Sequence, residues 1–150
     1  AEGEWSAATT SVREALDLTE GGGDLQALRW ASGVMAEVDI LEGRPAAARA
    51  RLLPLLDRPG LKECDVTRLL PLLAWAQLDL GEVDLAADAV GQALARAQPE
   101  EMRLVLVEAL RVRALVARQR EQWDVAARSL AEALALARSM PYLYAEARLV

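Results

Sequence analysis

The sequence predicts an all-α fold, and three observations support this prediction. Hydrophobic residues make up 53% of the chain and aromatic residues only 4%, so Ala and Leu, both strong helix formers, supply most of the apolar mass. Apolar residues recur at helical spacing, which places them on one face of each expected helix. A common pattern of small and apolar residues returns every 38–40 residues, which indicates a structural repeat.

The repeat emerges when residues are counted from four turn positions. These positions are Gly3, Gly43, Gly81 and Glu121, and they are separated by 40, 38 and 40 residues. The fifth residue after each turn is Ala, the thirteenth is Leu, and Ala also stands seven places before each of the last three turns. Small residues at these offsets let two antiparallel helices cross closely. Each unit is therefore expected to be a helix, a tight turn and a second helix.

The expected elements follow in order along a single domain, 1–150. A partial unit, 1–20, holds one helix, and the Gly21–Gly23 linker leads to Asp24, a suitable N-cap for the next helix. Three full units span about 24–60, 61–99 and 100–140, and a further helix starts within 141–150, so we expect a fragment of a longer protein. The helices are expected at about 5–19, 25–42, 45–57, 66–80, 84–97, 101–119 and 124–138, with the last beginning at Pro141.

Two prolines fall inside these expected helices. Proline cannot donate a backbone hydrogen bond and crowds the preceding turn, so it is tolerated only in the first turn of a helix. Pro54 therefore predicts a kink, whereas Pro71 fits a first turn if its helix starts late.

The composition excludes several classes of chemistry. The chain has no histidine and a single cysteine, Cys64, which rules out His-dependent catalytic triads, His metal sites and CxxC motifs. A net charge of −6 and a pI near 4.8 argue against direct contact with nucleic acid. Charged residues interrupt every apolar run before it reaches the length of a membrane span. We expect no catalysis, no cofactor, no metal and a cytoplasmic setting.

The segments "GEWSAATTSVREAL", "GEVDLAADAVGQAL" and "EQWDVAARSLAEAL" carry a family resemblance. Their spacing of small, aromatic and apolar residues resembles the second helix of the tetratricopeptide repeat (TPR), although the period exceeds the roughly 34 residues of that repeat. The longer unit is similar to the helical arrays of large bacterial ATP-binding regulators of the LuxR and AAA types. The resemblance implies a right-handed superhelix of antiparallel helix pairs, TPR-like, with the first helices lining a concave groove.

The resemblance also implies which residues face that groove, because the family uses fixed positions before each turn. Carried over by register, these positions mix aromatic, acidic and Arg side chains, as protein-binding surfaces do. The candidate groove residues are Trp30, Glu37, Arg68, Trp75, Asp79, Glu108, Arg111 and Arg118.

For several of these residues a purely structural role competes with binding. The resemblance places Trp5 and Trp123 between helices, where the family packs an aromatic residue. Trp30 and Trp75 fit the groove and the core between repeats equally well. Arg111 and Arg118 lie on one helical face and fit either a carboxylate or phosphate ligand or, as we favour, a solvated face.

These observations predict a non-catalytic interaction or scaffold module within a bacterial signalling or transcriptional regulator. Its partner would be a protein or peptide, or another domain of the same polypeptide, bound in the groove. The alternative is a domain that senses a small-molecule effector, as in a LuxR-type activator. Incomplete terminal units should leave apolar surface uncovered and favour self-association through the terminal helices. The residues expected there are Val12, Leu16, Leu143 and Leu149.

Overall fold

The described part of the chain is all-α, as the sequence predicts. The computed structural model describes residues 7, 10–14, 16–18, 24–57, 63–141 and 143–149, and every regular element in these ranges is a helix. Residues 10–14 and 16–18 are helical and precede the labelled elements. Those elements are α2 (Leu25–Leu41), α3 (Pro45–Leu52), the 3-10 helix η1 (Leu53–Leu55), α4 (Cys64–Thr67), α5 (Leu70–Asp79), α6 (Val83–Ala97), α7 (Arg103–Gln119), α8 (Trp123–Arg138) and α9 (Leu143–Ala147).

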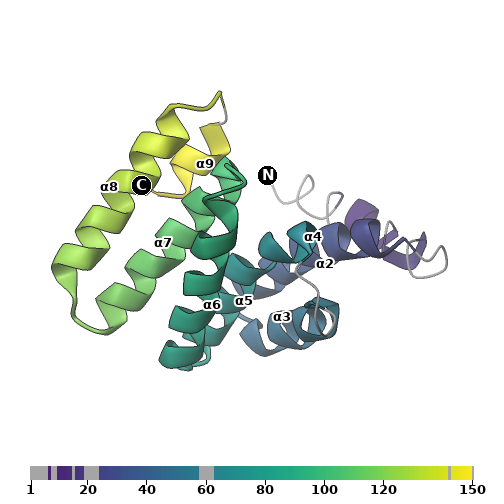
Figure 1. Cartoon of the computed structure of the whole chain (residues 1–150). Helices are drawn as coiled ribbons and strands as arrows, with labels where there is room; N and C mark the ends of the chain where they lie inside the picture. Colours follow the sequence, from purple (N-terminus) through teal and green to yellow (C-terminus); the bar gives the residue numbers. More distant parts are fainter. Residues whose placement is uncertain are drawn as a thin grey trace.

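Consecutive helices form hairpins that stand side by side (Figure 1). The helix α2 pairs with α3, α5 with α6, and α7 with α8, and each hairpin packs on the next through α3 against α5 and α6 against α7. The short α9 contacts both α7 and α8 near one end of the last hairpin. Within the described residues, no helix combines the length and the apolar character that a membrane span requires.

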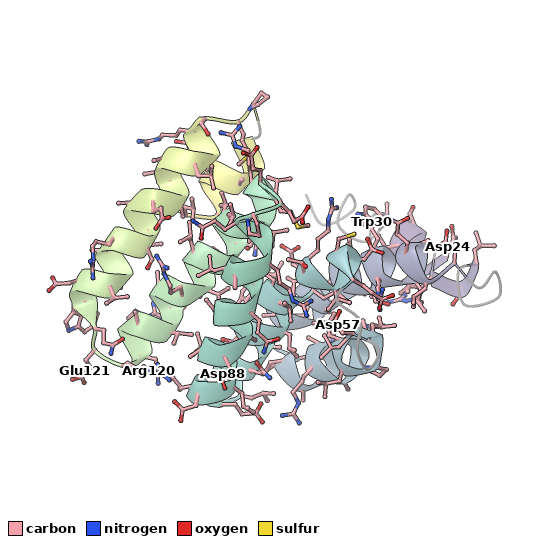
Figure 2. The ribbon with its side chains drawn as sticks, in the orientation of Figure 1. Asp24, Trp30, Asp57, Asp88, Arg120 and Glu121 are labelled. Atoms are coloured by element: carbon pink, nitrogen blue, oxygen red, sulfur yellow. The ribbon has the colours of Figure 1, made fainter. Side chains whose placement is uncertain are left out.

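The three hairpin turns have the same backbone conformation. Gly43, Gly81 and Glu121 adopt left-handed φ values of 75°, 80° and 57°, and Glu121 marks the turn between α7 and α8 (Figure 2). At each turn, the N–H of this residue donates to the carbonyl three residues earlier, and the next N–H donates to the carbonyl five residues before it. This pair of bonds is the Schellman motif, which satisfies carbonyls left free at a helix end. The structure therefore confirms the turns predicted at Gly43, Gly81 and Glu121, whereas Gly3 lies outside the described residues.

The expected prolines and helix boundaries agree with the structure in part. Asp24 caps α2 by accepting a hydrogen bond from the Ala27 N–H at 3.1 Å. Pro71 lies in the first turn of α5, as predicted for a late start, because the expected helix 66–80 is divided into α4 and α5. The expected kink at Pro54 is wrong: α3 ends at Leu52, and the proline lies in the 3-10 turn that follows.

The alanine columns lie where neighbouring helices cross. Ala36, Ala48, Ala74 and Ala86 are each 0% exposed and pack in two adjoining apolar clusters, one between α2, α3 and α5 and one between α5, α6 and α7. Their equivalent in α8, Ala126, is only half-buried. Close crossing through small side chains therefore holds for the first two hairpins and is looser in the third.

Buried polar contacts tie the connector after η1 to the helices on either side. Arg29 of α2 is 3% exposed, donates to the Leu55 carbonyl at 2.9 Å and pairs with Glu63 at 2.5 Å. Asp57 pairs with Arg96 of α6, and this hydrogen-bonded guanidinium lowers the pKa of the Asp57 carboxyl below its usual value. These charge pairs add to the apolar contacts of Leu55 and Leu56, which are partly buried against the core clusters.

Two expectations about the ends of the array are corrected. Trp123, expected between helices, is 63% exposed, because no described helix covers that end of α8; Trp5 and Gly21–Gly23 lie outside the described residues. Leu16, expected to be uncovered, is 7% exposed and packs with Ala31 and Met35, with Val12 partly buried beside them. Leu149 is also partly buried, against Val107 and Ala137, and the side chain of Leu143 lies outside the described residues.

Candidate functional site

Two adjoining pockets lie between α2, the α4–α5 turn and the start of α7. The first has a volume of about 370 Å³ and is lined mainly by α2, α4 and α5. The second has a volume of about 430 Å³ and extends along α7 to Arg148. Glu37, Arg68, Leu72 and Met102 line both pockets, so we treat the two together as one surface and call it the groove.

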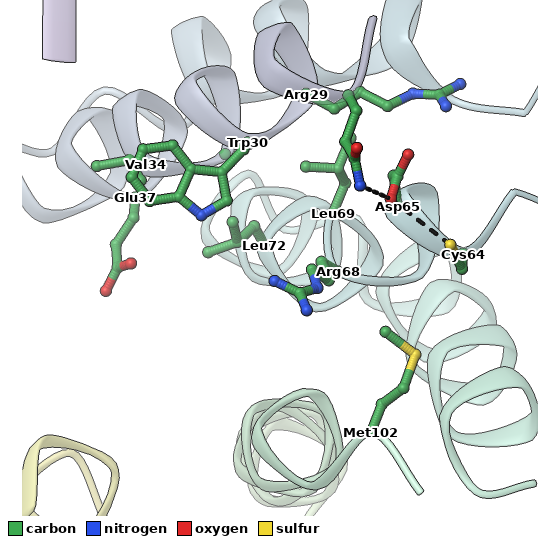
Figure 3. A pocket seen from close by; sticks show the side chains of 12 residues that line it. Arg29, Trp30, Val34, Glu37, Cys64, Asp65, Arg68, Leu69, Leu72 and Met102 are labelled. Atoms are coloured by element: carbon green, nitrogen blue, oxygen red, sulfur yellow. Dashed lines mark hydrogen bonds between the residues drawn. The ribbon is translucent and has the colours of Figure 1, made fainter. Parts of the chain in front are cut away.

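The apolar part of the groove centres on Trp30. Its side chain is 60% exposed although it belongs to α2, whose opposite face is buried. Figure 3 shows the Trp30 ring, Leu72 and the Arg68 guanidinium around one opening, with Met102 approaching from the turn before α7. An exposed Trp beside aliphatic side chains provides a large, rigid contact surface at low conformational cost.

The depth of the first pocket depends on a glycine. Gly33 is buried in α2, and a Cβ at this position would lie 3.2 Å from Leu69 Cδ2 and 3.7 Å from Leu72 Cδ1. A side chain here would crowd the end of the Leu69 side chain, which would have to shift by a few tenths of an ångström. Glycine thus allows the close approach that forms the floor of the groove.

A charged cluster lies at the other end of the groove and joins three helices. Arg148, just after α9, pairs with Glu37 of α2 at 2.7 Å and with Glu108 of α7 at 3.2 Å. Arg111 Nε also contacts Glu108, at 3.2 Å. The Trp75 ring of α5 lies beneath both cations, 4.2 Å from the Arg111 guanidinium and 5.4 Å from that of Arg148, within range of cation–π attraction.

Burial changes the electrostatics of this cluster. Arg111 is 9% exposed, and this burial lowers the pKa of its guanidinium, an effect opposed by Glu108. Partial desolvation raises the pKa of the Asp79 carboxyl, and Arg111 opposes that shift. A buried guanidinium that stacks on Trp75 has a fixed position, and it adds positive potential to the groove from below.

Arg68 differs from these arginines. It lies at the junction of the two pockets with an exposed side chain, and it makes none of the hydrogen bonds or ion pairs found among the described residues. Of the acidic residues that line the first pocket with it, Glu37 pairs with Arg148, whereas Asp65 has no ion pair among the described residues and accepts a hydrogen bond from the neutral Gln26 amide at 3.3 Å. Of the two charged residues that line both pockets, Glu37 is therefore paired, and Arg68 keeps its positive charge without an ion pair among the described residues.

The structure brings six of the eight candidate residues together. Trp30, Glu37, Arg68 and Glu108 line the groove, and Trp75 and Arg111 join them through the charged cluster. Asp79 and Arg118 are exposed and line neither pocket. Trp75 is half-buried against two core clusters, so it supports the core as well as the groove.

The expectation of a solvated face at Arg111 is wrong, while Arg118 is exposed as expected. Arg111 is buried because Trp75 of the neighbouring helix α5 covers it, while Glu108, one turn earlier on α7 itself, pairs with its Nε. Helical spacing places Arg111 and Arg118 on one face of α7. Spacing alone cannot show that a neighbouring helix covers this face at Arg111 and not at Arg118.

Sequence reasoning missed Arg148, Leu72 and Met102. Arg148 had a usable signal, because Trp30, Arg68, Glu108 and Arg148 follow one another at intervals of 38, 40 and 40 residues. All four line the groove, so the repeat register predicts the fourth from the other three. Leu72 and Met102 had no such signal, since they belong to the interrupted helix and to a turn.

The described residues contain no group of three or more acidic, Cys or His side chains that could hold a metal ion. A comparison with protein-family models finds none that matches this chain, and a comparison with curated proteins finds no significant match.

Proposed function

We propose that this chain is a non-catalytic interaction module that binds a segment of a protein in its groove. The observation that carries the proposal is the lining of the groove by one repeat register. Residues at the same position of successive units, from Trp30 to Arg148, face a continuous surface of two pockets. A surface built along an array suits an extended or helical segment better than a single compact ligand.

The wider setting is proposed on the resemblance of the repeat. The Schellman turns and the buried alanine columns support a TPR-like array of helix pairs. On this basis we propose that the module belongs to a multidomain bacterial regulator of signalling or transcription in the cytoplasm. Its partner is then a protein or peptide, or another domain of the same polypeptide.

The proposal is tested by blocking the groove without touching the core. Peptides selected on the wild-type chain from a random displayed library should bind Met102→Trp at least about tenfold more weakly, a loss of about 1.4 kcal/mol, because Met102 lines both pockets and the larger ring would narrow the groove where they meet. Leu85→Trp is the matched control, since Leu85 is 53% exposed on α6 and lines neither pocket. Equal helix content by circular dichroism shows that both variants fold. Selected peptides that bind both variants equally, or the absence of any selected peptide, would contradict the proposal.

A second candidate is a sensor of a small effector. The pocket volumes of about 370 and 430 Å³ lie within the range of roughly 300–1,000 Å³ that small-molecule sites occupy. These volumes support the sensor as a second candidate. This function predicts that a compound from an effector library raises the thermal midpoint of the wild-type chain but not of Met102→Trp. If no compound raises the midpoint and the selected peptides need the groove, the sensor function is excluded and peptide binding remains.

A further inference from the structure

We propose that the segment bound by the groove carries an apolar side chain beside an acidic one, with the apolar group packed on Trp30 and Leu72 and the side-chain carboxylate paired with Arg68. This inference rests on the proposed function and states the chemistry of its partner. It follows from the distribution of compensated and uncompensated charge along the groove.

The first step concerns the cations. Arg148 and Arg111 are each held by carboxylates within the groove, whereas Arg68 makes none of the ion pairs of the described residues. The chain carries 23 acidic residues against 17 basic ones, so a shortage of carboxylates does not explain this. Arg68 stands where the pockets meet, and its guanidinium can form two parallel bonds to a carboxylate.

The second step concerns the anions. A cationic ligand would need a carboxylate. Glu37 and Glu108 are both paired with Arg148, whereas Asp65 and Glu101 line one pocket each and make none of the ion pairs of the described residues. Glu108 is also contacted by Arg111 from beneath. Displacing these contacts would leave the buried Arg111 poorly compensated, at a cost that an incoming cation would have to offset. At the junction of the two pockets, which Arg68 lines and Asp65 and Glu101 do not, the charges therefore favour an acidic side chain over a basic one.

The third step concerns the apolar contact. Trp30 is 60% exposed, and Gly33 keeps the pocket beneath it open. Leu72 lines both pockets together with Arg68, so an apolar group on this wall lies beside the guanidinium. Apolar packing next to the ion pair would exclude water from it and strengthen the bonds to the carboxylate. A partner with both groups adjacent would use both features at once.

The test uses three pools of dodecapeptides with a central Leu, blocked by acetyl and amide groups at their ends. The pools differ only in the residue beside the Leu, which is Glu, Gln or Lys. Binding is measured by fluorescence anisotropy with labelled peptides and the full chain. The Glu pool should bind about tenfold more tightly than the Gln pool, as expected for a hydrogen bond between charged groups, and the Lys pool should bind most weakly.

Variants assign this preference to one residue. Arg68→Gln should bind the Glu and Gln pools equally, and Arg68→Glu should prefer the Lys pool. Arg118→Glu is the matched control, because Arg118 is exposed, lies outside both pockets and should keep the wild-type preference. Trp30→Ala should weaken all three pools by a similar factor.

The outcomes separate this inference from the function on which it rests. Equal binding of the three pools, still abolished by Met102→Trp, would overturn the inference and leave the proposed function standing. Binding of these peptides only when their terminal carboxylate is free would also overturn it, since the pairing would then not involve a side chain. If no pool binds, with its terminal carboxylate either blocked or free, both the inference and the proposed function are contradicted.

Discussion

At the scale of single residues, buried alanines allow neighbouring helices of this protein to pack closely where they cross. Ala36, Ala48, Ala74 and Ala86 have no exposed surface, and each lies in a cluster to which two or three helices contribute. A methyl group is the largest side chain that such close crossings accommodate. Substitutions that add volume at these positions should therefore force the helices apart.

Ala86→Leu should lower the free energy of unfolding by about 1–3 kcal/mol through overpacking. Ala126→Leu should cost less, because Ala126 is only half-buried in α8. Ala127→Leu is the control, being the same change at an exposed position of that helix. Urea titrations of the three variants provide the measurement, and an Ala86→Leu midpoint equal to that of the wild type would refute the close crossing.

Substitution of Trp75 should lower the stability of the fold much more than substitution of Trp30. Trp75 packs against two core clusters and beneath Arg111, so Trp75→Ala should cost about 2–4 kcal/mol, toward the lower part of the range for core tryptophans. Trp30→Ala should change stability by less than about 0.5 kcal/mol, because the side chain is 60% exposed. Thermal and urea melts test both, and a large loss with Trp30→Ala would place that residue in the core.

At the scale of elements, the hairpin turns decide where each helix ends. The left-handed position is glycine at 43 and 81 but glutamate at 121, with φ values of 75°, 80° and 57°. A side chain at positive φ carries a steric cost that glycine avoids. The third turn keeps the Schellman bonds of the other two, with the Glu121 N–H donating to the Arg118 carbonyl at 3.0 Å. The fold therefore tolerates a strained residue at that turn.

Glu121→Gly should raise the free energy of unfolding by about 0.5–1 kcal/mol, because the relief of strain exceeds the extra freedom that glycine gives the unfolded chain. Gly81→Ala should act in the opposite direction by about 1 kcal/mol, since it introduces a side chain at positive φ. Denaturant titrations measure both changes, provided that the dependence of the unfolding free energy on denaturant concentration is the same for the variants and the wild type. If Glu121→Gly is less stable than the wild type, the glutamate side chain stabilises the fold by more than its backbone strain destabilises it.

At the scale of the whole molecule, each helix pair depends on its neighbour for cover. The face of α6 that carries Val90 packs against Val112 and Val116 of α7. On α8, the equivalent face has only α9 beside it among the described elements, and Leu130 and Trp123 are 38% and 63% exposed. Apolar surface is thus left open on α8 and at Leu18, which is 77% exposed, rather than at the expected positions Leu16 and Leu149.

Self-association through α8 is the corresponding prediction. Exposed apolar stripes of this kind seldom stay bare in soluble monomers, so the wild-type chain should form dimers or larger species as its concentration rises. The double variant Trp123→Gln/Leu130→Gln should remain monomeric with unchanged helix content. Light scattering across a concentration series measures both, and a wild-type chain that stays monomeric throughout would exclude α8 as a contact surface.

The sequence by itself determined the helical class, the repeat period, the hairpin turns and most of the buried alanine positions. These features are local: a helix repeats its buried face every few residues, and a left-handed turn or a capping Asp24 acts within one helix end. The period also indicated Trp30, Arg68 and Glu108 as residues on one surface, because equivalent positions of stacked units must face the same way.

Only the tertiary structure decided which of these side chains are covered and which charges are compensated. Arg111 is buried and Arg118 exposed on one face of α7, because Trp75 reaches only the first of them. Arg148 pairs with Glu37 across 111 residues of chain, and so leaves Arg68, where the two pockets meet, without an ion pair among the described residues. Coulomb and packing energies depend on distances between units, and a pattern within one unit contains no information on those distances.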